Sequence, residues 1–151
     1  MLSKKSKYGL QALLALTQAP QGSSVLISEL AEKEHIPKKF LEAILLELKK
    51  QGILQSKTGK GGGYQLAKHP SQIKLGQVIR ILEGPLAPVS CVSQSAYKRC
   101  EECKDEYRCG IRLVMKEVRD AIANILDNTS LEEMNLKAKK LTEEMSPNYH
   151  I

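Results

Sequence analysis

The sequence contains no tryptophan and a single phenylalanine, and aromatic residues make up 4% of its 151 positions. A packed interior must therefore be built from aliphatic side chains, which is feasible because 42% of the residues are hydrophobic. No run approaches about 18 apolar residues, so we expect no membrane-spanning helix. Gln11 and Gln18 interrupt the apolar part of the basic N-terminus, and we interpret it as an amphipathic helix of a cytoplasmic protein rather than a secretion signal.

Acidic residues are scarce in the first half of the chain. Residues 1–80 carry 13 Lys and Arg against 5 Asp and Glu, whereas residues 81–151 carry 10 against 12. The net charge of +6 is thus concentrated in one basic segment. Such a segment attracts phosphate polyanions, because Lys and Arg displace the counterions condensed on them. Charge alone also allows a basic, solvated surface with no partner.

Hydrophobic periodicity in the basic half predicts three helices. Apolar residues at helical spacing indicate a first helix over residues 4–18, which the sequence APQGS ends. Ser28 is expected to cap a short second helix over residues 28–33. Pro37 is expected to begin a third helix that ends at Gly52.

The third predicted helix has two distinct faces. We expect one face to be buried, because its apolar residues fall in a single stripe: Phe40, Leu41, Ile44, Leu45 and Leu48. The opposite face carries Lys38, Lys39 and Glu42 near the start of the helix. These three side chains are left free to meet a partner.

A glycine-rich stretch follows, with four glycines and two lysines between Lys57 and Tyr64. Short strands are expected at residues 53–54 and 64–66, so the stretch forms the tip of a hairpin. The order of helix, helix, turn, helix and hairpin is typical of a winged helix-turn-helix, whose third helix enters the major groove. Glycines let the tip turn tightly beside a DNA backbone, where Lys57 and Lys60 reach phosphates or a narrow minor groove.

Two other interpretations of the glycines are a nucleotide-binding loop and a flexible linker. A phosphate-binding loop needs G-x-x-x-x-G-K-[ST] between a strand and a helix. Here Gly59 and Lys60 are followed by Gly61, and the preceding element is a predicted helix. The pattern therefore favours a DNA-binding wing.

The segment ISELAEKEHIPKKFLEAILLELKKQGILQSKTGKGGGYQLAK, with its G-G-G-Y motif after a recognition helix, resembles the Rrf-two (Rrf2) family of bacterial transcription regulators. The similarity continues through IKLGQVIRILEG and VMKEVRDAIANILDNTSLEEM, so it covers nearly the whole chain. The family includes the iron–sulfur cluster regulator, the nitric-oxide-sensing repressor and the cysteine-metabolism repressor. The expected fold class is mainly α: a winged helix-turn-helix domain with a long C-terminal dimerisation helix. The resemblance implies a homodimer that binds a pseudo-palindromic operator in double-stranded DNA.

The resemblance also implies DNA contacts. Glu42 falls where the iron–sulfur cluster regulator has a glutamate that reads a base edge, and a carboxylate can accept from the cytosine amino group. Alternatively, Glu42 is a solvated residue that moderates a basic face. The wing departs from that regulator at Thr58, where the regulator has an arginine. The expected DNA-binding residues are Lys38, Lys39, Glu42, Lys57, Thr58, Lys60, Gly61, Gly62 and Tyr64.

Cysteine is missing from the basic half and crowded into one short stretch of the other. The spacing is C-x8-C-x2-C-x5-C: Cys91, Cys100, Cys103 and Cys109. In a cytoplasmic protein such crowding is more typical of a metal or redox site than of structural disulfides. The residues leave four interpretations: an iron–sulfur cluster (2Fe–2S or 4Fe–4S), zinc, a metal-free thiol switch, and inert thiols. Nearby Arg99, Lys104 and Arg108 are expected to lower the thiol pKa values.

The resemblance implies which cysteines matter. Cluster-sensing members have three cysteines before the dimerisation helix, which Cys91, Cys103 and Cys109 match, with Cys100 as an addition. The iron–sulfur cluster regulator uses a histidine as fourth ligand where this chain has Arg112, which cannot ligate. The nitric-oxide sensor uses a first-helix aspartate, where this chain has about Lys7. Either Cys100 or an exogenous group is therefore expected as the fourth ligand.

A long helix is predicted over residues 111–126. Its apolar positions form one seam, Ile111, Val114, Met115, Val118, Ile122 and Ile125. The seam suits either an intradomain core or a dimer interface, and the resemblance favours the dimer. Ser130 and Glu133 predict a capping box for a short last helix.

The chain is thus expected to divide into a DNA-binding module (1–82), a cysteine-rich sensor loop (83–110), a dimerisation helix with a short terminal helix (111–145) and a disordered tail (146–151). An enzyme is not expected, because catalysis needs an acid–base partner near the cysteines. The three histidines, His35, His69 and His150, lie far from them in the sequence. The expected function is a sequence-specific transcriptional regulator that senses iron–sulfur or redox status. A zinc- or thiol-based regulator is the alternative, and a thiol enzyme the more distant one.

Overall fold

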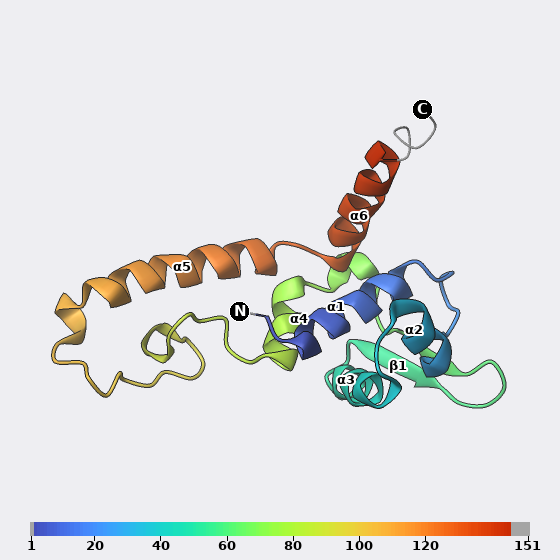
Figure 1. The fold of residues 1–151 in the computed structure, drawn as a ribbon, viewed down its shortest axis with the longest axis horizontal. Coiled ribbons are helices and arrows are strands. Elements are labelled where there is room, and N and C mark those ends of the chain that lie inside the picture. The colour runs from blue at the N-terminus through green and yellow to red at the C-terminus, as the bar shows by residue number, and fades with distance from the viewer. Residues whose placement is uncertain (1, 146–151) are drawn as a thin grey trace.

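The structure, a computed structural model, describes residues 2–145. It is mainly helical, as the sequence predicts, with one small antiparallel sheet (Figure 1). The helices and strands are α1 (Lys4–Thr17), α2 (Ile27–Glu34), α3 (Lys38–Lys50), β1 (Leu54–Lys57), β2 (Gly63–Leu66), α4 (Leu75–Leu82), α5 (Gly110–Asp127) and α6 (Leu131–Met145). Three 3-10 turns connect them: η1 (Pro70–Gln72), η2 (Ser90–Val92) and η3 (Glu106–Arg108).

The core lies between α1, α3 and α4 and is almost entirely aliphatic. Its fully buried side chains include Leu13 of α1, Leu41 and Ile44 of α3 and Val78 of α4. Phe40 was expected in the buried stripe of α3, and that prediction is wrong: 38% of it is exposed. It lies at the edge of the stripe, where its ring packs edge-to-face against Tyr8 with the ring centroids 5.6 Å apart.

The helix ends agree with the sequence prediction in part. Gly52 follows α3 with a φ of +79°, as expected of a residue that ends a helix in the left-handed region. Ser28 was expected to cap α2, but the helix begins at Ile27 after Leu26, which makes no side-chain capping bond. Val25, just before α2, is held in extended form by a bridge to Tyr64, and this tertiary contact sets where α2 begins.

The hairpin pairs Leu54 with Leu66 at its base and Lys57 with Gly63 at its tip. Val25 adds two backbone hydrogen bonds of 2.8 Å to Tyr64, on the other edge of β2. The hairpin is therefore fixed to the segment that precedes α2, and the predicted winged helix-turn-helix is present.

The C-terminal half extends away from this domain. α5 projects to one side with the cysteine-containing loop alongside it, and α6 leaves the domain in another direction (Figure 1). The last helix was expected to be short, but α6 has 15 residues. One half of its predicted capping box is present, since Ser130 Oγ accepts the Glu133 N–H at 3.1 Å. The predicted disordered tail lies outside the described residues.

α4 was not predicted, although its sequence LGQVIRIL is strongly amphipathic. It buries Leu75, Val78 and Leu82 against α1 and α3. Across residues 2–145, no helix combines the length and apolar character that crossing a bilayer requires.

Candidate DNA-binding face and cysteine site

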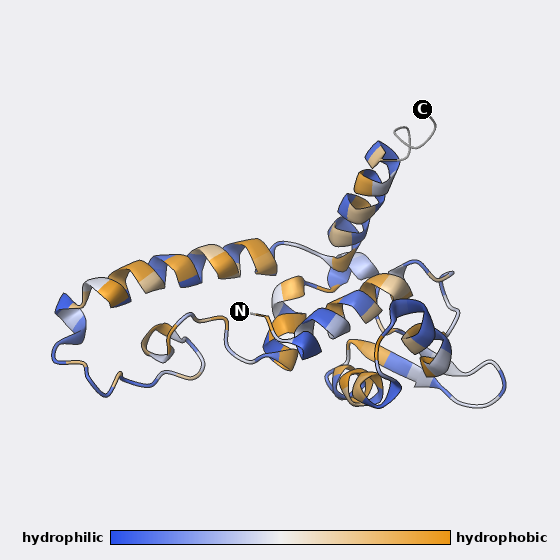
Figure 2. Cartoon of the chain, in the orientation of Figure 1, coloured by the Kyte–Doolittle hydropathy of each residue, from blue (hydrophilic) through white to orange (hydrophobic). Residues whose placement is uncertain are grey.

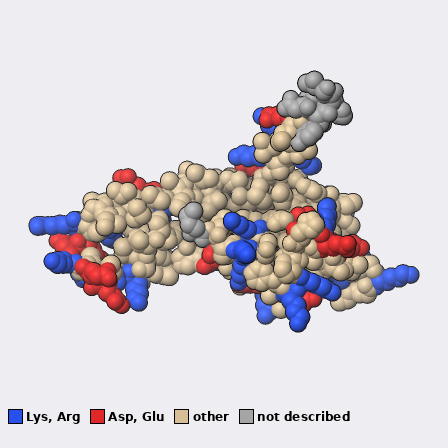
Figure 3. All heavy atoms as spheres, in the orientation of Figure 1, with Lys and Arg blue, Asp and Glu red and all other residues tan. Residues whose placement is uncertain are grey.

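α3 presents a charged surface on the side opposite the core. Lys38, Lys39 and Glu42 are all exposed, whereas Leu41 and Ile44 of the same helix are fully buried. The helical period separates these two sets, because residues three or four apart share a face. In the space-filling view, several Lys and Arg side chains lie around α3, and a basic side chain projects at the hairpin tip (Figure 3). The structure thus places the predicted recognition helix and wing on one side of the molecule.

The hairpin tip carries the predicted wing residues. Lys57, Thr58 and Lys60 are exposed there. Gly59 and Gly61 have φ values of +88° and +77°, in the left-handed region where glycine is favoured. The tip turns tightly because of these residues and points its lysines into solvent.

Gly62 and Tyr64 have a clear role in building the wing. A Cβ at Gly62 would lie 2.3 Å from the carbonyl oxygen of Lys57, so no side chain fits inside the turn. Tyr64 pairs with both Ser56 and Val25 through its backbone, and its half-buried ring packs on the core. Gly62 and Tyr64 therefore help to position Lys57 and Lys60 at the tip of the hairpin.

All four cysteines line one hollow of about 650 Å³ between the loop and the start of α5. Cys91, Cys103 and Cys109 are half-buried, and Cys100 is exposed. Residues that are up to 18 positions apart in the sequence are therefore brought together as the spacing suggests. Within the described range 2–145, no three Cys, His, Asp or Glu side chains are placed to hold a single metal ion.

Cys109 and Cys100 occupy contrasting positions in the hollow. Cys109 is the N-cap of α5, and its Sγ accepts the backbone N–H of Arg112 at 3.4 Å. The Cys100 thiol donates to the carboxylate of Glu102 at 3.1 Å, and this hydrogen bond raises the pKa of the thiol. The expectation that neighbouring cations lower the thiol pKa is therefore wrong for Cys100, because an acidic side chain is its immediate partner.

Arg112 also lines the hollow. Its Nε is buried and has no hydrogen-bond partner within residues 2–145. The guanidinium therefore keeps an unused N–H donor on a residue that lines the same hollow as the four cysteines. This arrangement suits a group that accepts hydrogen bonds, as thiolates and sulfides do.

Arg119 fixes the cysteine loop to α5, a role that was not predicted. Its Nη1 donates to the carbonyl oxygen of Val92 at 2.7 Å, and only 14% of its side chain is exposed. Val92 follows Cys91 and is itself buried. The sequence did indicate that Arg119 faces the same side as the apolar seam, because it lies four residues after Met115 and three before Ile122.

The outer face of α5 is apolar and exposed. Ile111, Val114, Val118 and Ile125 from the predicted seam expose 71%, 53%, 37% and 64% of their surfaces. Hydrophobic residues recur along the length of the helix (Figure 2). Several exposed apolar side chains on one helix face typically mark an interaction surface.

The chain is similar in sequence to a known family of proteins. The profile of the Rrf2 family, described as an iron-dependent transcriptional regulator, matches residues 2–136. An rrf2-like HTH-type transcriptional regulator of Rhodobacter capsulatus is 41% identical over 137 residues, which span 89% of this chain and 91% of the relative.

Two solved structures share the fold over most of their length. CymR, the global cysteine regulator of B. subtilis, superposes with a TM-score of 0.75 at 28% identity, over 91% of this chain and 97% of that one. IscR of T. potens superposes with a TM-score of 0.74 at 29% identity, over 93% and 90%. CymR of Bacillus subtilis and IscR of Pectobacterium atrosepticum are HTH-type transcriptional regulators.

Proposed function

The chain belongs to the Rrf2 family of transcriptional regulators, and on this premise we propose that it is a homodimer that binds a pseudo-palindromic DNA operator and senses iron–sulfur or redox status. The proposal rests on one observation: the chain combines a charged helix and hairpin, a cysteine site and an exposed apolar helix. A charged helix and wing share one side, four cysteines line one hollow, and an exposed apolar helix starts at the last cysteine. We propose that the protein acts in the cytoplasm, because the DNA that it would bind is located there.

Each predicted DNA-contacting residue has a chemical role. Lys38, Lys39, Lys57 and Lys60 neutralise phosphates, which positions the protein without reading sequence. Glu42 accepts from a cytosine amino group in the major groove. The exposed backbone of Thr58 and Gly61 approaches the sugar–phosphate chain, and Gly62 and Tyr64 keep the wing in shape.

Four thiols that line one hollow support an iron–sulfur cluster as the group bound there. Cys91, Cys103 and Cys109 are half-buried and would provide thiolates, with Cys100 or an exogenous group as fourth ligand. The unpartnered Nε of Arg112 offers the cluster a hydrogen bond. When bound, such a cluster supplies one-electron redox chemistry and sensitivity to oxidants.

A regulator with zinc or metal-free redox thiols is the second candidate. The exposed Cys100 and the C-x-x-C pair that it forms with Cys103 favour this reading. Similarity to the cysteine regulator CymR is compatible with it.

The path from sensor to DNA runs through α5. Arg119 holds the start of the cysteine loop to this helix, and Cys109 caps it at the other end of the loop. A change at the cysteines therefore acts on α5 from two points. If α5 forms the dimer interface, the change alters the spacing of the two wings, which must match half-sites about 34–36 Å apart.

An anaerobic preparation tests the proposal. We expect the purified protein to show the charge-transfer absorption of an iron–sulfur cluster, and to select a palindromic duplex from genomic fragments at low salt. A variant with Cys91, Cys103 and Cys109 changed to alanine should lose the absorption and bind that duplex with altered affinity. A colourless protein with zinc or no metal would favour the second candidate. A monomer without preference for any duplex would refute both.

A further inference from the structure

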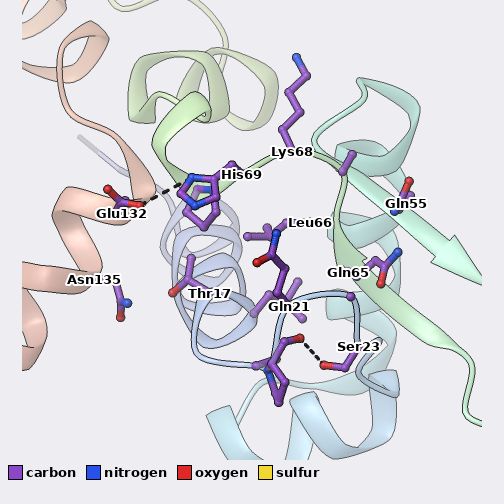
Figure 4. A pocket seen from close by; sticks show the side chains of 16 residues that line it. Thr17, Gln21, Ser23, Gln55, Gln65, Leu66, Lys68, His69, Glu132 and Asn135 are labelled. Atoms are coloured by element: carbon purple, nitrogen blue, oxygen red, sulfur yellow. Dashed lines mark hydrogen bonds and ion pairs between the residues drawn. The ribbon is translucent and has the colours of Figure 1, made fainter.

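The loop before α2 lies against the hairpin. In the close-up, Ser23 of this loop and Gln65 of β2 line one cavity of about 540 Å³, with Asn135 of α6 on its other side (Figure 4). Ser23 is held in a turn, because its backbone N–H and its hydroxyl both donate to the carbonyl oxygen of Pro20, at 3.0 and 2.6 Å. The loop therefore offers the hairpin a fixed point of attachment.

Two residues of the loop are bonded to the hairpin. Val25 exchanges two backbone hydrogen bonds of 2.8 Å with Tyr64. Ser24 is half-buried, and its hydroxyl donates to the carbonyl oxygen of Gly61 at 2.7 Å. Gly63 allows this close approach, since a Cβ there would lie 2.1 Å from the carbonyl oxygen of Val25. The loop thus continues the sheet by one bridge and reaches the tip of the wing.

The tip of the wing, residues 58–62, has few other attachments. The paired strands end at Lys57 and Gly63. Three of the five tip residues are glycines, whose backbone is the least restricted of any residue. Across residues 2–145, the Ser24 hydroxyl makes the one hydrogen bond that reaches the tip from outside the hairpin. This bond therefore limits the directions in which Lys60 can point.

We propose that Ser24 is a positioning residue for DNA binding, which sets the direction of the wing relative to α3. The inference rests on the proposed contact between the wing and the DNA backbone. The loop leads directly into α2, whose buried Leu30 belongs to the same core as Leu41 of α3. The Ser24 hydroxyl therefore connects the wing tip to the body that carries the predicted recognition helix. A tip that is already fixed loses less conformational entropy when it meets DNA, so this bond favours binding.

Substitution of the hydroxyl tests the proposal on the full-length protein and the duplex that it selects. Ser24→Ala should weaken the affinity about two- to tenfold, the factor to which one intramolecular hydrogen bond corresponds. Ser24→Thr keeps a hydroxyl and should restore an affinity close to that of the wild type. The control is Thr142→Ala, which removes a hydroxyl that also donates to a backbone carbonyl oxygen, on α6. It should leave the affinity unchanged.

A double-mutant cycle with Lys60→Ala separates positioning from a general loss of stability. If Ser24 acts by directing Lys60, Ser24→Ala should cost less affinity in the Lys60→Ala background than in the wild type. Ser24→Ala should also lower the slope of log affinity against log salt, because the wing neutralises phosphates less completely. The base preference assigned to Glu42 should stay the same, since α3 is not moved.

Proteolysis of the free protein reports on the tip directly. Trypsin cuts after lysine, and Lys60 is exposed at the tip. Cleavage there should be faster in Ser24→Ala than in the wild type or Ser24→Thr, because a loosened loop tip enters a protease more readily. Circular dichroism confirms that all variants fold.

The outcomes distinguish this inference from the proposed function. If Lys60→Ala leaves the salt slope unchanged, the wing does not contact DNA, and the role of Ser24 is wrong together with that contact. If Lys60→Ala lowers the slope but Ser24→Ala binds like the wild type, only the role of Ser24 is overturned. It is also overturned if the two losses of affinity simply add, or if Ser24→Thr binds no better than Ser24→Ala.

Discussion

The guanidinium of Arg80 holds the carboxylate of Asp127 through two hydrogen bonds, 2.5 Å from Nη1 to Oδ1 and 3.0 Å from Nη2 to Oδ2. The pair joins α4 to the last residue of α5. Gly76 lies against it, since a Cβ there would be 2.0 Å from Asp127 Oδ1. The missing side chain at position 76 therefore makes room for a fixed link between the two parts of the chain.

Asp127→Asn should lower stability at neutral pH. The hydrogen bond from Arg80 lowers the pKa of Asp127, so its contribution is present above the ordinary value of about 3.9 and disappears as the pH falls below it. Both side chains are about two-fifths exposed, at 41% and 43%, which limits the effect. We expect a loss of about 0.5–1 kcal/mol at pH 7 in urea unfolding.

The control is Glu117→Gln, which removes an exposed carboxylate from the same helix. The difference between wild type and Asp127→Asn should shrink in strong acid. A gap that is unchanged at low pH would mean that the ion pair is not its source.

Gly9→Ala should destabilise the domain. A Cβ at position 9 of α1 would lie 2.3 Å from Cδ1 of Leu82 and 3.4 Å from Cγ2 of Ile44. Leu82 is buried, so it cannot move into solvent, and the core must be overpacked. We expect a loss of about 1–3 kcal/mol in denaturant unfolding. Gly110→Ala is the control, because no atom lies within 4 Å of its added methyl group; it should be neutral or slightly stabilising.

Lys60→Ala and Glu42→Ala should change DNA binding in different ways. Loss of one phosphate contact at the wing should reduce the slope of log affinity against log salt by about one, uniformly across sequences. Loss of the Glu42 carboxylate should relax the preference at one operator position and leave the slope nearly unchanged. Fluorescence anisotropy over a salt series measures both, with Lys139→Ala on α6 as the control. Equal slopes for wild type and Lys60→Ala would argue against the wing contact.

Val114→Asp should convert the proposed dimer to a monomer. Val114 exposes 53% of its surface on the apolar face of α5, where a charge would have to be buried on association. Sedimentation analysis at micromolar concentration measures the change, and Lys116→Asp, on an exposed position of the same helix, should leave the assembly intact. If the two variants sediment alike, α5 is not the interface.

Elements that depend on local pattern could be predicted from the sequence. The apolar spacing of α3 and α5, the glycine that ends α3 and the capping box of α6 all use neighbours within one or two helical turns. Two of the errors arose where a distant contact decides. Ser28 matches a helix cap, yet Tyr64 from the hairpin holds Val25 and sets the start of α2. Phe40 matches the apolar stripe, yet it packs on Tyr8 at the surface.

By itself, the sequence determined the order of the first three helices and the hairpin, the basic half, the charged face of α3 and the grouping of four cysteines beside a long amphipathic helix, because each of these depends on residue type and short spacing. Only the tertiary structure decided that Arg119 holds the cysteine loop to α5, that Arg80 joins α4 to Asp127, and that Gln65 and Asn135 line one cavity. These pairs are 27, 47 and 70 residues apart, and no local pattern specifies which distant side chains a folded chain brings together.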